Sequence, residues 1–387
     1  MMRRIFVWAH RYAGLAVAAF LVIEGITGSL LAFNTALEHK LNPQLFAKHR
    51  AGHHMSLGAL AVRAEKLVPN GRVDYVFDDP DQAMVRMEAR GLDQLFLDPW
   101  TGAELGRRTF GDLSQGRINI MPFVYNIHAQ LAWGPTGTTL LGAVALLWTV
   151  DCFVALYVTL PRVRAGFWRR WMMAWRVKSD AGAFRLNFDL HRAGGLWAWV
   201  LLLVFAWSSV MLAWPSFYAS VTKAVLPYRT DFDVEATALA HPVSPRRLDW
   251  LAAENVGRQR LAEVASRHGL TLGKGDSLAY IPAFGVYSYF ASSNLDVRGE
   301  SAGTGVWFDA GSGALREEFL PTRGQAGQTV SSWLWALHYG DVRNNPVYRT
   351  AVAIMGLWVA MLSVTGIYIW FAKRRNRTAH LGRPSLS

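Results

Sequence analysis

The chain has 387 residues, 52% of them hydrophobic, and a formal net charge of +12. Its single cysteine, Cys152, excludes an intramolecular disulfide, a c-type haem attachment and a protein-held iron–sulfur cluster. The apolar residues gather in four long runs, which is typical of membrane-spanning helices. We see no basic patch on a soluble domain that would favour nucleic-acid binding, so we interpret the basic excess as a topology signal.

In chain order, the sequence predicts a bundle of four membrane-spanning helices that alternates with two long outer segments. Each run approaches the ~20 residues needed to cross a hydrocarbon core of ~30 Å. The predicted boundaries are a first helix over 1–35, an outer segment over 36–137, a second helix over 138–160, a basic loop over 161–190, a third helix over 191–216, a second outer segment over 217–346, a fourth helix over 347–372 and a tail over 373–387. We interpret the first helix as an uncleaved anchor, because its apolar run is too long for a signal peptide.

Lys and Arg residues cluster at three places that belong on one face of this bundle. They flank the first helix, fill the loop over 161–190 and follow the fourth helix. The positive-inside rule makes that face cytoplasmic. We therefore expect both termini in the cytoplasm and both outer segments on the outer side of the membrane.

The two outer segments repeat one order of predicted elements. A helical stretch, 57–67 or 246–268, precedes alternating apolar strands and a hairpin, FLDPWTGAELGRR at 96–108 or WFDAGSGALREEF at 307–319. In both hairpins an apolar strand ends at Asp and the turn contains Gly, which favours left-handed turn positions. We predict two small α+β units and a loop over 221–243.

Four histidines recur at matched positions in the two halves. His10 and His191 lie at the starts of the first and third helices, and His128 and His338 lie just before the second and fourth. This repeat indicates an internal duplication. Imidazole is a good axial ligand for haem iron, and helical bundles often hold haem. Because a full span separates the two faces by ~30 Å, we predict an inner haem on His10 and His191 and an outer haem on His128 and His338.

Each candidate residue also has a plainer interpretation. Histidines at helix ends can snorkel to the headgroups. Arg11 and Arg192 follow the inner histidines and suit either haem propionates or ordinary anchoring. Glu24 and Asp151 lie inside spans, where a carboxylate usually faces a cavity, a partner or a cofactor. We consider each of them either part of a proton path that accompanies electron transfer or a residue with a structural hydrogen-bonding role.

The motifs HRYAGL at 10–15, DPWTG at 98–102 and IHAQLAWGPTG at 127–137 resemble the PepSY-associated transmembrane helix family, also called iron-regulated membrane proteins. The resemblance covers nearly the whole chain and is strongest to inner-membrane ferric-siderophore reductases of the ferrioxamine type. It implies PepSY-like outer units, two b-type haems, a bacterial inner-membrane location and a periplasmic ferric siderophore as substrate, with a hydroxamate suspected. The DVRNN sequence at 341–345 departs from the Gly-rich lead after His128.

We therefore predict an inner-membrane di-haem reductase that passes electrons across the membrane and releases Fe(II) from a ferric siderophore for uptake. Hard oxygen ligands hold Fe(III) more tightly than Fe(II), so one electron frees the metal. The sequence has no Gly-rich dinucleotide fingerprint, so we expect an external cytoplasmic or quinol donor. The alternatives are a siderophore or haem permease, and a non-enzymatic periplasmic binding or regulatory protein.

Overall fold

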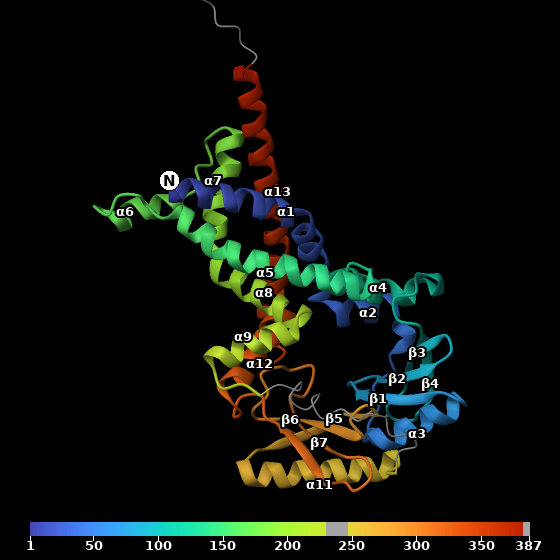
Figure 1. Cartoon of the computed structure of the whole chain (residues 1–387). Coiled ribbons are helices and arrows are strands. Elements are labelled where there is room, and N and C mark those ends of the chain that lie inside the picture. The colour runs from blue at the N-terminus through green and yellow to red at the C-terminus, as the bar shows by residue number, and fades with distance from the viewer. Residues whose placement is uncertain (230–246, 382–387) are drawn as a thin grey trace, which may run out of the picture.

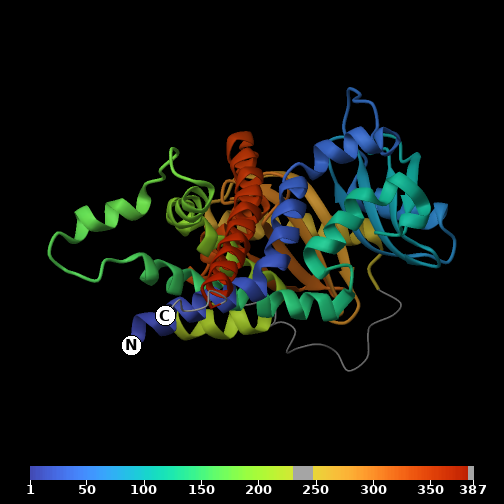
Figure 2. The ribbon, with the colours of Figure 1, turned by 90° about the horizontal axis from the view of Figure 1, so that it is seen from above.

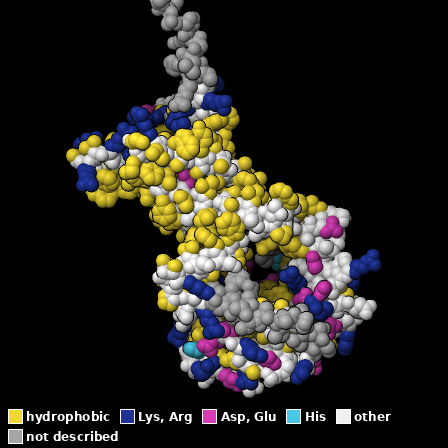
Figure 3. Space-filling model, in the orientation of Figure 1, with side chains coloured by type: hydrophobic (Ala, Val, Ile, Leu, Met, Phe, Trp, Pro, Cys, Tyr) yellow, Lys and Arg dark blue, Asp and Glu magenta, His cyan; other side chains and the backbone are white. Residues whose placement is uncertain are grey.

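The computed structural model describes residues 1–229 and 247–381, which form a helical part and a sheet part (Figure 1). Hydrophobic side chains gather over the helical part, whereas acidic and basic side chains are frequent over the sheet part (Figure 3). Dark blue Lys and Arg side chains also gather at the end of the helical part that lies away from the sheet (Figure 3). The surface therefore separates an apolar body from two polar ends.

Among the described residues, three helices are long and apolar enough to cross a membrane: α1 (Met2–Leu31), α5 (Gly134–Thr159) and α13 (Pro346–Leu381). A fourth crossing requires α7 (Ala183–Trp197) and α8 (Trp199–Ala213) to form one span, and these two helices are bent by 71°. The single third helix predicted over 191–216 is therefore wrong: the helix begins earlier, at Ala183, and breaks at Ala198.

The bend between α7 and α8 has an identifiable cause. The Gly194 carbonyl accepts hydrogen bonds from the Ala198 N–H at 3.2 Å and from the Trp358 indole of α13 at 3.1 Å. The Trp199 indole donates to the Cys152 carbonyl of α5 at 2.9 Å. Thus α7 packs against α13 while α8 packs against α5, and the break follows a weak helix-forming Gly-Gly pair.

Small residues let α1 and α13 cross at close range. A Cβ atom added to Gly25 would lie 2.3 Å from the Gly356 carbonyl oxygen. Ser29 donates its hydroxyl to the Ala353 carbonyl at 2.7 Å. Close backbone approach at small residues is a common way for membrane helices to associate. This crossing brings residues of the two ends of the chain together.

The remaining helical elements of the described residues range from three residues in η1 to 19 residues in α11. They are α2 (Asn34–Leu41), η1 (Pro43–Leu45), α3 (Leu57–Leu67), η2 (Leu113–Asn119), α4 (Ile120–Gln130), α6 (Phe167–Trp171), η3 (Met172–Trp175), α9 (Pro215–Val225), α11 (Trp250–His268) and α12 (Ala326–Tyr339). The green segment with α6 projects sideways from the helical part (Figure 2). The predicted loop over 221–243 begins inside α9, and its portion from residue 230 onward lies outside the described residues.

All eight described strands form one antiparallel sheet with the order β4-β3-β2-β1-β5-β6-β7-β8. The strands are β1 (Arg72–Asp78), β2 (Ala83–Ala89), β3 (Leu92–Leu97), β4 (Glu104–Arg108), β5 (Leu272–Ile281), β6 (Val286–Ser293), β7 (Thr304–Asp309) and β8 (Leu315–Phe319). The two predicted units are therefore joined: β1 pairs with β5, with Val76 opposite Leu278. Both of these side chains are fully buried, so the pairing removes two strand edges and buries apolar surface.

The repeated helix and hairpin pattern of the two halves is confirmed. Helices α3 and α11 pack on the sheet and share one apolar core with it. Asp98 accepts the N–H groups of Trp100 and Thr101, and Asp309 accepts those of Gly311 and Ser312. Each carboxylate thus closes the turn that the sequence placed after it.

Candidate functional site

The structure brings His10 of α1 beside His191 of α7, and we call these two residues the inner pair. Their ring centres lie 6.1 Å apart. The Nδ1 atom of His10 lies 3.0 and 2.9 Å from the two carboxylate oxygens of Asp151 on α5. The Nδ1 atom of His191 lies 2.9 Å from the Leu362 carbonyl oxygen and 3.2 Å from the Thr365 hydroxyl, both on α13.

The outer pair has the same construction at the sheet side of the helices. His128 in the last turn of α4 faces His338 in the last turn of α12, with ring centres 6.2 Å apart. The Nδ1 atom of His128 lies 3.0 Å from the Thr27 hydroxyl and 3.1 Å from the Glu24 carboxylate, both on α1. The Nδ1 atom of His338 lies 2.8 Å from the Ser208 hydroxyl on α8. The structure therefore brings the two histidines of each predicted pair close together.

The hydrogen bonds are compatible with the same tautomer in all four rings. The Asp151 carboxylate and the Leu362 carbonyl can only accept, so His10 and His191 carry their proton on Nδ1. Thr27 and Ser208 each lie within hydrogen-bond distance of a carbonyl of their own helix, at 2.7 and 3.1 Å, and when their hydroxyls donate to these carbonyls they accept from His128 and His338. Nε2 is then the unprotonated nitrogen of every ring, which is the form that binds a metal.

The spacing of each pair fits an iron ion between two imidazoles. A metal bound by one nitrogen of each ring holds the ring centres roughly 6 Å apart, close to the 6.1 and 6.2 Å seen in the two pairs. Among the described residues there is no group of three or more His, Cys, Asp or Glu side chains suited to a bare metal ion. Two protein ligands per site suit haem, because the porphyrin supplies the other four nitrogens.

Glycines make room for two of the rings, one in each pair. A Cβ atom on Gly28 would lie 3.0 Å from Cε1 of His128, and one on Gly366 would lie 3.2 Å from Cε1 of His191. Each glycine follows the threonine that accepts the hydrogen bond from the same ring. The sequence carries this signal as ITG at 26–28 and VTG at 364–366, and our reading of the sequence missed it. Ser208 has no comparable sequence signal.

A cavity of about 1250 Å³ extends from the outer pair toward the sheet. His128, His338 and Trp148 line its helical end, and Tyr75 and Arg86 line its sheet end. Figure 3 shows the molecule hollowed between the two parts, with acidic and basic side chains around the opening. The cavity exceeds the roughly 300–1,000 Å³ of most small-molecule sites, so it has room for more than one bound group.

The two arginines beside the inner pair differ in their surroundings. Arg11 follows His10 on α1 and is half-buried. Arg192 binds the Asp189 carboxylate at 2.8 Å and the carbonyls of Ala174 and Met173 at 3.1 Å. A haem propionate would therefore compete with existing partners at Arg192.

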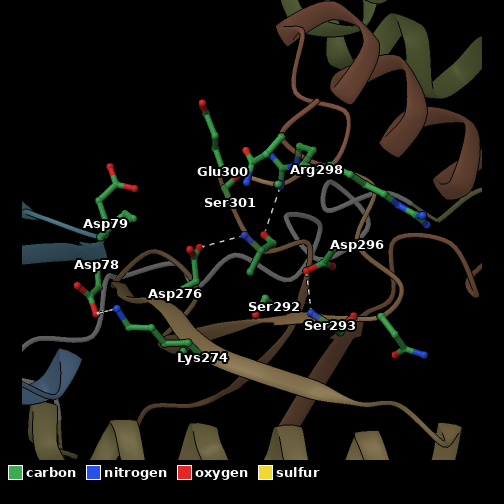
Figure 4. Close-up of a pocket in the computed structure, with 17 residues that line it drawn as sticks. Asp78, Asp79, Lys274, Asp276, Ser292, Ser293, Asp296, Arg298, Glu300 and Ser301 are labelled. Atoms are coloured by element: carbon green, nitrogen blue, oxygen red, sulfur yellow. Dashed lines mark hydrogen bonds and ion pairs between the residues drawn. The ribbon is translucent and has the colours of Figure 1, made fainter. Parts of the chain in front are cut away.

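A second hollow of about 620 Å³ lies in the sheet part, where Asp78, Asp79, Asp276 and Lys274 line it (Figure 4). Lys274 binds Asp78 at 2.6 Å, and His54 binds the same carboxylate at 2.8 Å. Burial raises the pKa of Asp79 to about 7 and that of Asp276 to about 6. These charges are partly balanced within the hollow, and we assign it no separate function.

Long apolar helices attached to an eight-stranded antiparallel sheet define a membrane protein with a polar sheet domain. The sequence matches the PepSY-associated TM region family over residues 7–373, and the chain belongs to this family. No curated protein matches the sequence. The predicted family and membrane character are confirmed, whereas the reductase subtype stays a prediction.

Proposed function

We propose that this protein is a bacterial inner-membrane di-haem reductase that reduces Fe(III) in a periplasmic ferric siderophore. The observation that carries the proposal is the geometry of the two histidine pairs. Each pair places two Nδ1-protonated rings at the spacing of an iron ion with two axial imidazoles. Two such sites in one helical bundle favour electron transfer over simple ligand storage.

In this proposal His10 and His191 hold the inner b-type haem, and His128 and His338 hold the outer one. Bound haem supplies one-electron transfer at each site. The protein fixes the orientation and tautomer of the four imidazoles through the hydrogen bonds that their Nδ1–H groups donate to acceptors on α1, α5, α8 and α13. Because α1 touches both sites, at His10 and at Thr27, helix rise separates them by roughly 25 Å along its axis.

The cavity beside the outer pair supports a substrate site at the sheet side. It continues beyond His128 and His338 to strand residues such as Tyr75 and Arg86. Arg298 also lines it, with its guanidinium 5.3 Å from the centre of the Trp335 ring. Aromatic and cationic side chains at this end suit a bulky chelate with oxygen ligands, and a hydroxamate-type chelate is our favoured substrate. One electron would weaken the hold of such hard ligands on the iron.

The charge distribution supports outward electron flow. Lys and Arg side chains gather at the end of the helical part away from the sheet (Figure 3). The positive-inside rule assigns that end to the cytoplasm and the sheet to the periplasm. The donor, a cytoplasmic protein or a quinol, would then reach the inner pair first.

The first test is the visible spectrum of the purified protein in mild detergent, oxidised and dithionite-reduced, with haem quantified per chain. We expect two low-spin b-type haems. His10→Ala and His191→Ala should each remove the same haem, and His128→Ala and His338→Ala the other. Colourless protein from haem-replete cells would refute the proposal. Uptake of a redox-inert gallium chelate into proteoliposomes would favour a permease instead.

A further inference from the structure

The two histidine pairs share an asymmetry in their hydrogen-bond partners. In each pair one ring faces a carboxylate and the other faces only uncharged acceptors. Asp151 is the partner of His10, and Glu24 is a partner of His128. His191 instead contacts a carbonyl and a hydroxyl group, and His338 contacts a hydroxyl group.

The two carboxylate contacts are not equivalent. Both oxygens of Asp151 lie within 3.0 Å of Nδ1 of His10, and the Asp151 side chain is buried. Only one oxygen of Glu24 contacts His128, at 3.1 Å, and Thr27 competes for the same proton at 3.0 Å. Among the described residues, the other oxygen of Glu24 has no hydrogen-bond partner. Asp151 therefore acts on its histidine more directly than Glu24 does.

We propose that Asp151 and Glu24 are positioning residues that strengthen His10 and His128 as ligands, with Asp151 the stronger of the two. This inference rests on the proposed function. A carboxylate that accepts the Nδ1 proton raises the basicity of Nε2 and fixes the ring orientation. A more basic axial ligand stabilises Fe(III) over Fe(II) and lowers the reduction potential of the haem. Asp151 would thus give the inner haem the lower potential, so that electrons run downhill toward the outer site.

The test is a spectroscopic redox titration of the full-length protein and its variants with haem bound. Asp151→Asn keeps a hydrogen-bond acceptor but removes the charge, and it should raise the inner potential while leaving the outer one unchanged. Glu24→Gln should raise the outer potential by a smaller amount, because Thr27 still accepts from His128. Asp180→Asn is the control: it removes the charge of an exposed carboxylate in the connection before α7, and both potentials should stay near the wild-type values. The His10→Ala and His128→Ala variants assign each potential to its site.

The outcomes separate this inference from the proposed function. Wild-type protein without haem would refute the proposed function itself. Wild-type protein with two haems, and unchanged potentials in Asp151→Asn, would overturn only the role of Asp151. If Asp151→Asn loses the inner haem, Asp151→Glu decides: recovery of the haem at the wild-type potential supports the role of the charge, and loss in both variants overturns it.

Discussion

Each histidine of the two pairs is held by residues from another helix, and two of the rings pack against a glycine. Gly28 lies against His128, and Gly366 lies against His191. A side chain at either position would push the ring it contacts, because protein interiors have little free volume. Gly28 therefore leaves space for a ring of the outer pair, and Gly366 leaves space for a ring of the inner pair.

We predict that Gly28→Val displaces His128 and removes the outer haem, whereas Gly366→Val displaces His191 and removes the inner haem. Each variant should bind about half the haem of the wild-type protein, as measured by the pyridine haemochrome assay. Gly14→Val on α1 is the control, because a Cβ atom at Gly14 would have no heavy atom within 4 Å. Equal haem content in all three variants would contradict this role of the glycines.

Asp79 gives the sheet part a dependence of stability on pH. Burial, followed by the charges of Glu300 and Asp276, raises the pKa of Asp79 from 3.8 to about 7. Between these two values the folded state binds more protons at this site than the unfolded chain does. Its contribution to stability therefore falls as the pH rises from about 4 to 7.

We predict that Asp79→Asn increases stability relative to the wild-type protein at pH 8 and has less effect at pH 5. Denaturant titrations in detergent at the two pH values measure the difference. Asp180→Asn, which changes an exposed carboxylate in the connection before α7, should show no such trend. A constant difference between Asp79→Asn and the wild-type protein at both pH values would exclude Asp79 as the titrating group.

At the scale of elements, α11 packs against both halves of the sheet part. Its Trp250 side chain is fully buried, lies 5.4 Å from the Tyr287 ring and donates its indole N–H to Glu65 of α3 at 3.0 Å. Asp249 caps the helix by accepting the Ala252 N–H at 2.7 Å. One aromatic side chain thus links α11, α3 and β6.

We predict that Trp250→Ala destabilises the sheet part by about 3–5 kcal/mol, the usual cost of removing a buried aromatic side chain. The neighbouring Leu251 is 47% exposed, so Leu251→Ala should cost at most about 0.5 kcal/mol, as surface substitutions do. Circular dichroism of the strand signal during denaturation measures both variants. Similar losses in the two variants would show that Trp250 is not an anchor of the sheet.

At the scale of the whole molecule, the sheet and the basic end of the helical part lie on opposite sides of the apolar body (Figures 1 and 3). A hydrocarbon layer around the apolar helices would separate Arg90 of the sheet part from Arg169 of α6. Both side chains are exposed. The only native cysteine, Cys152, is buried, so engineered cysteines can report the topology.

We predict that a membrane-impermeant maleimide labels Arg90→Cys in intact spheroplasts but labels Arg169→Cys only after lysis. Unmodified protein should give little background because of the burial of Cys152. Labelling of both positions from outside, or the reverse order, would refute the proposed orientation and with it the direction of electron flow.

The sequence by itself determined the apolar helices, the repeated helix and hairpin pattern, and the four histidines. These features are local: hydrophobic run length, Asp-Gly turn chemistry and a repeated residue are all visible along the chain. The sequence also predicted the pairing of the histidines from the face on which each helix end lies, because a full span keeps the two faces apart.

Only the tertiary structure decided what each residue contacts. The bend at Ala198 depends on indoles of Trp358 and Trp199 that bind carbonyls of other helices, and the single sheet depends on β1 meeting β5. In the same way, Asp151 and Glu24 became partners of specific histidines only through helix packing. Such contacts join residues at least 47 positions apart, and no local pattern specifies which of many polar side chains will meet a given imidazole.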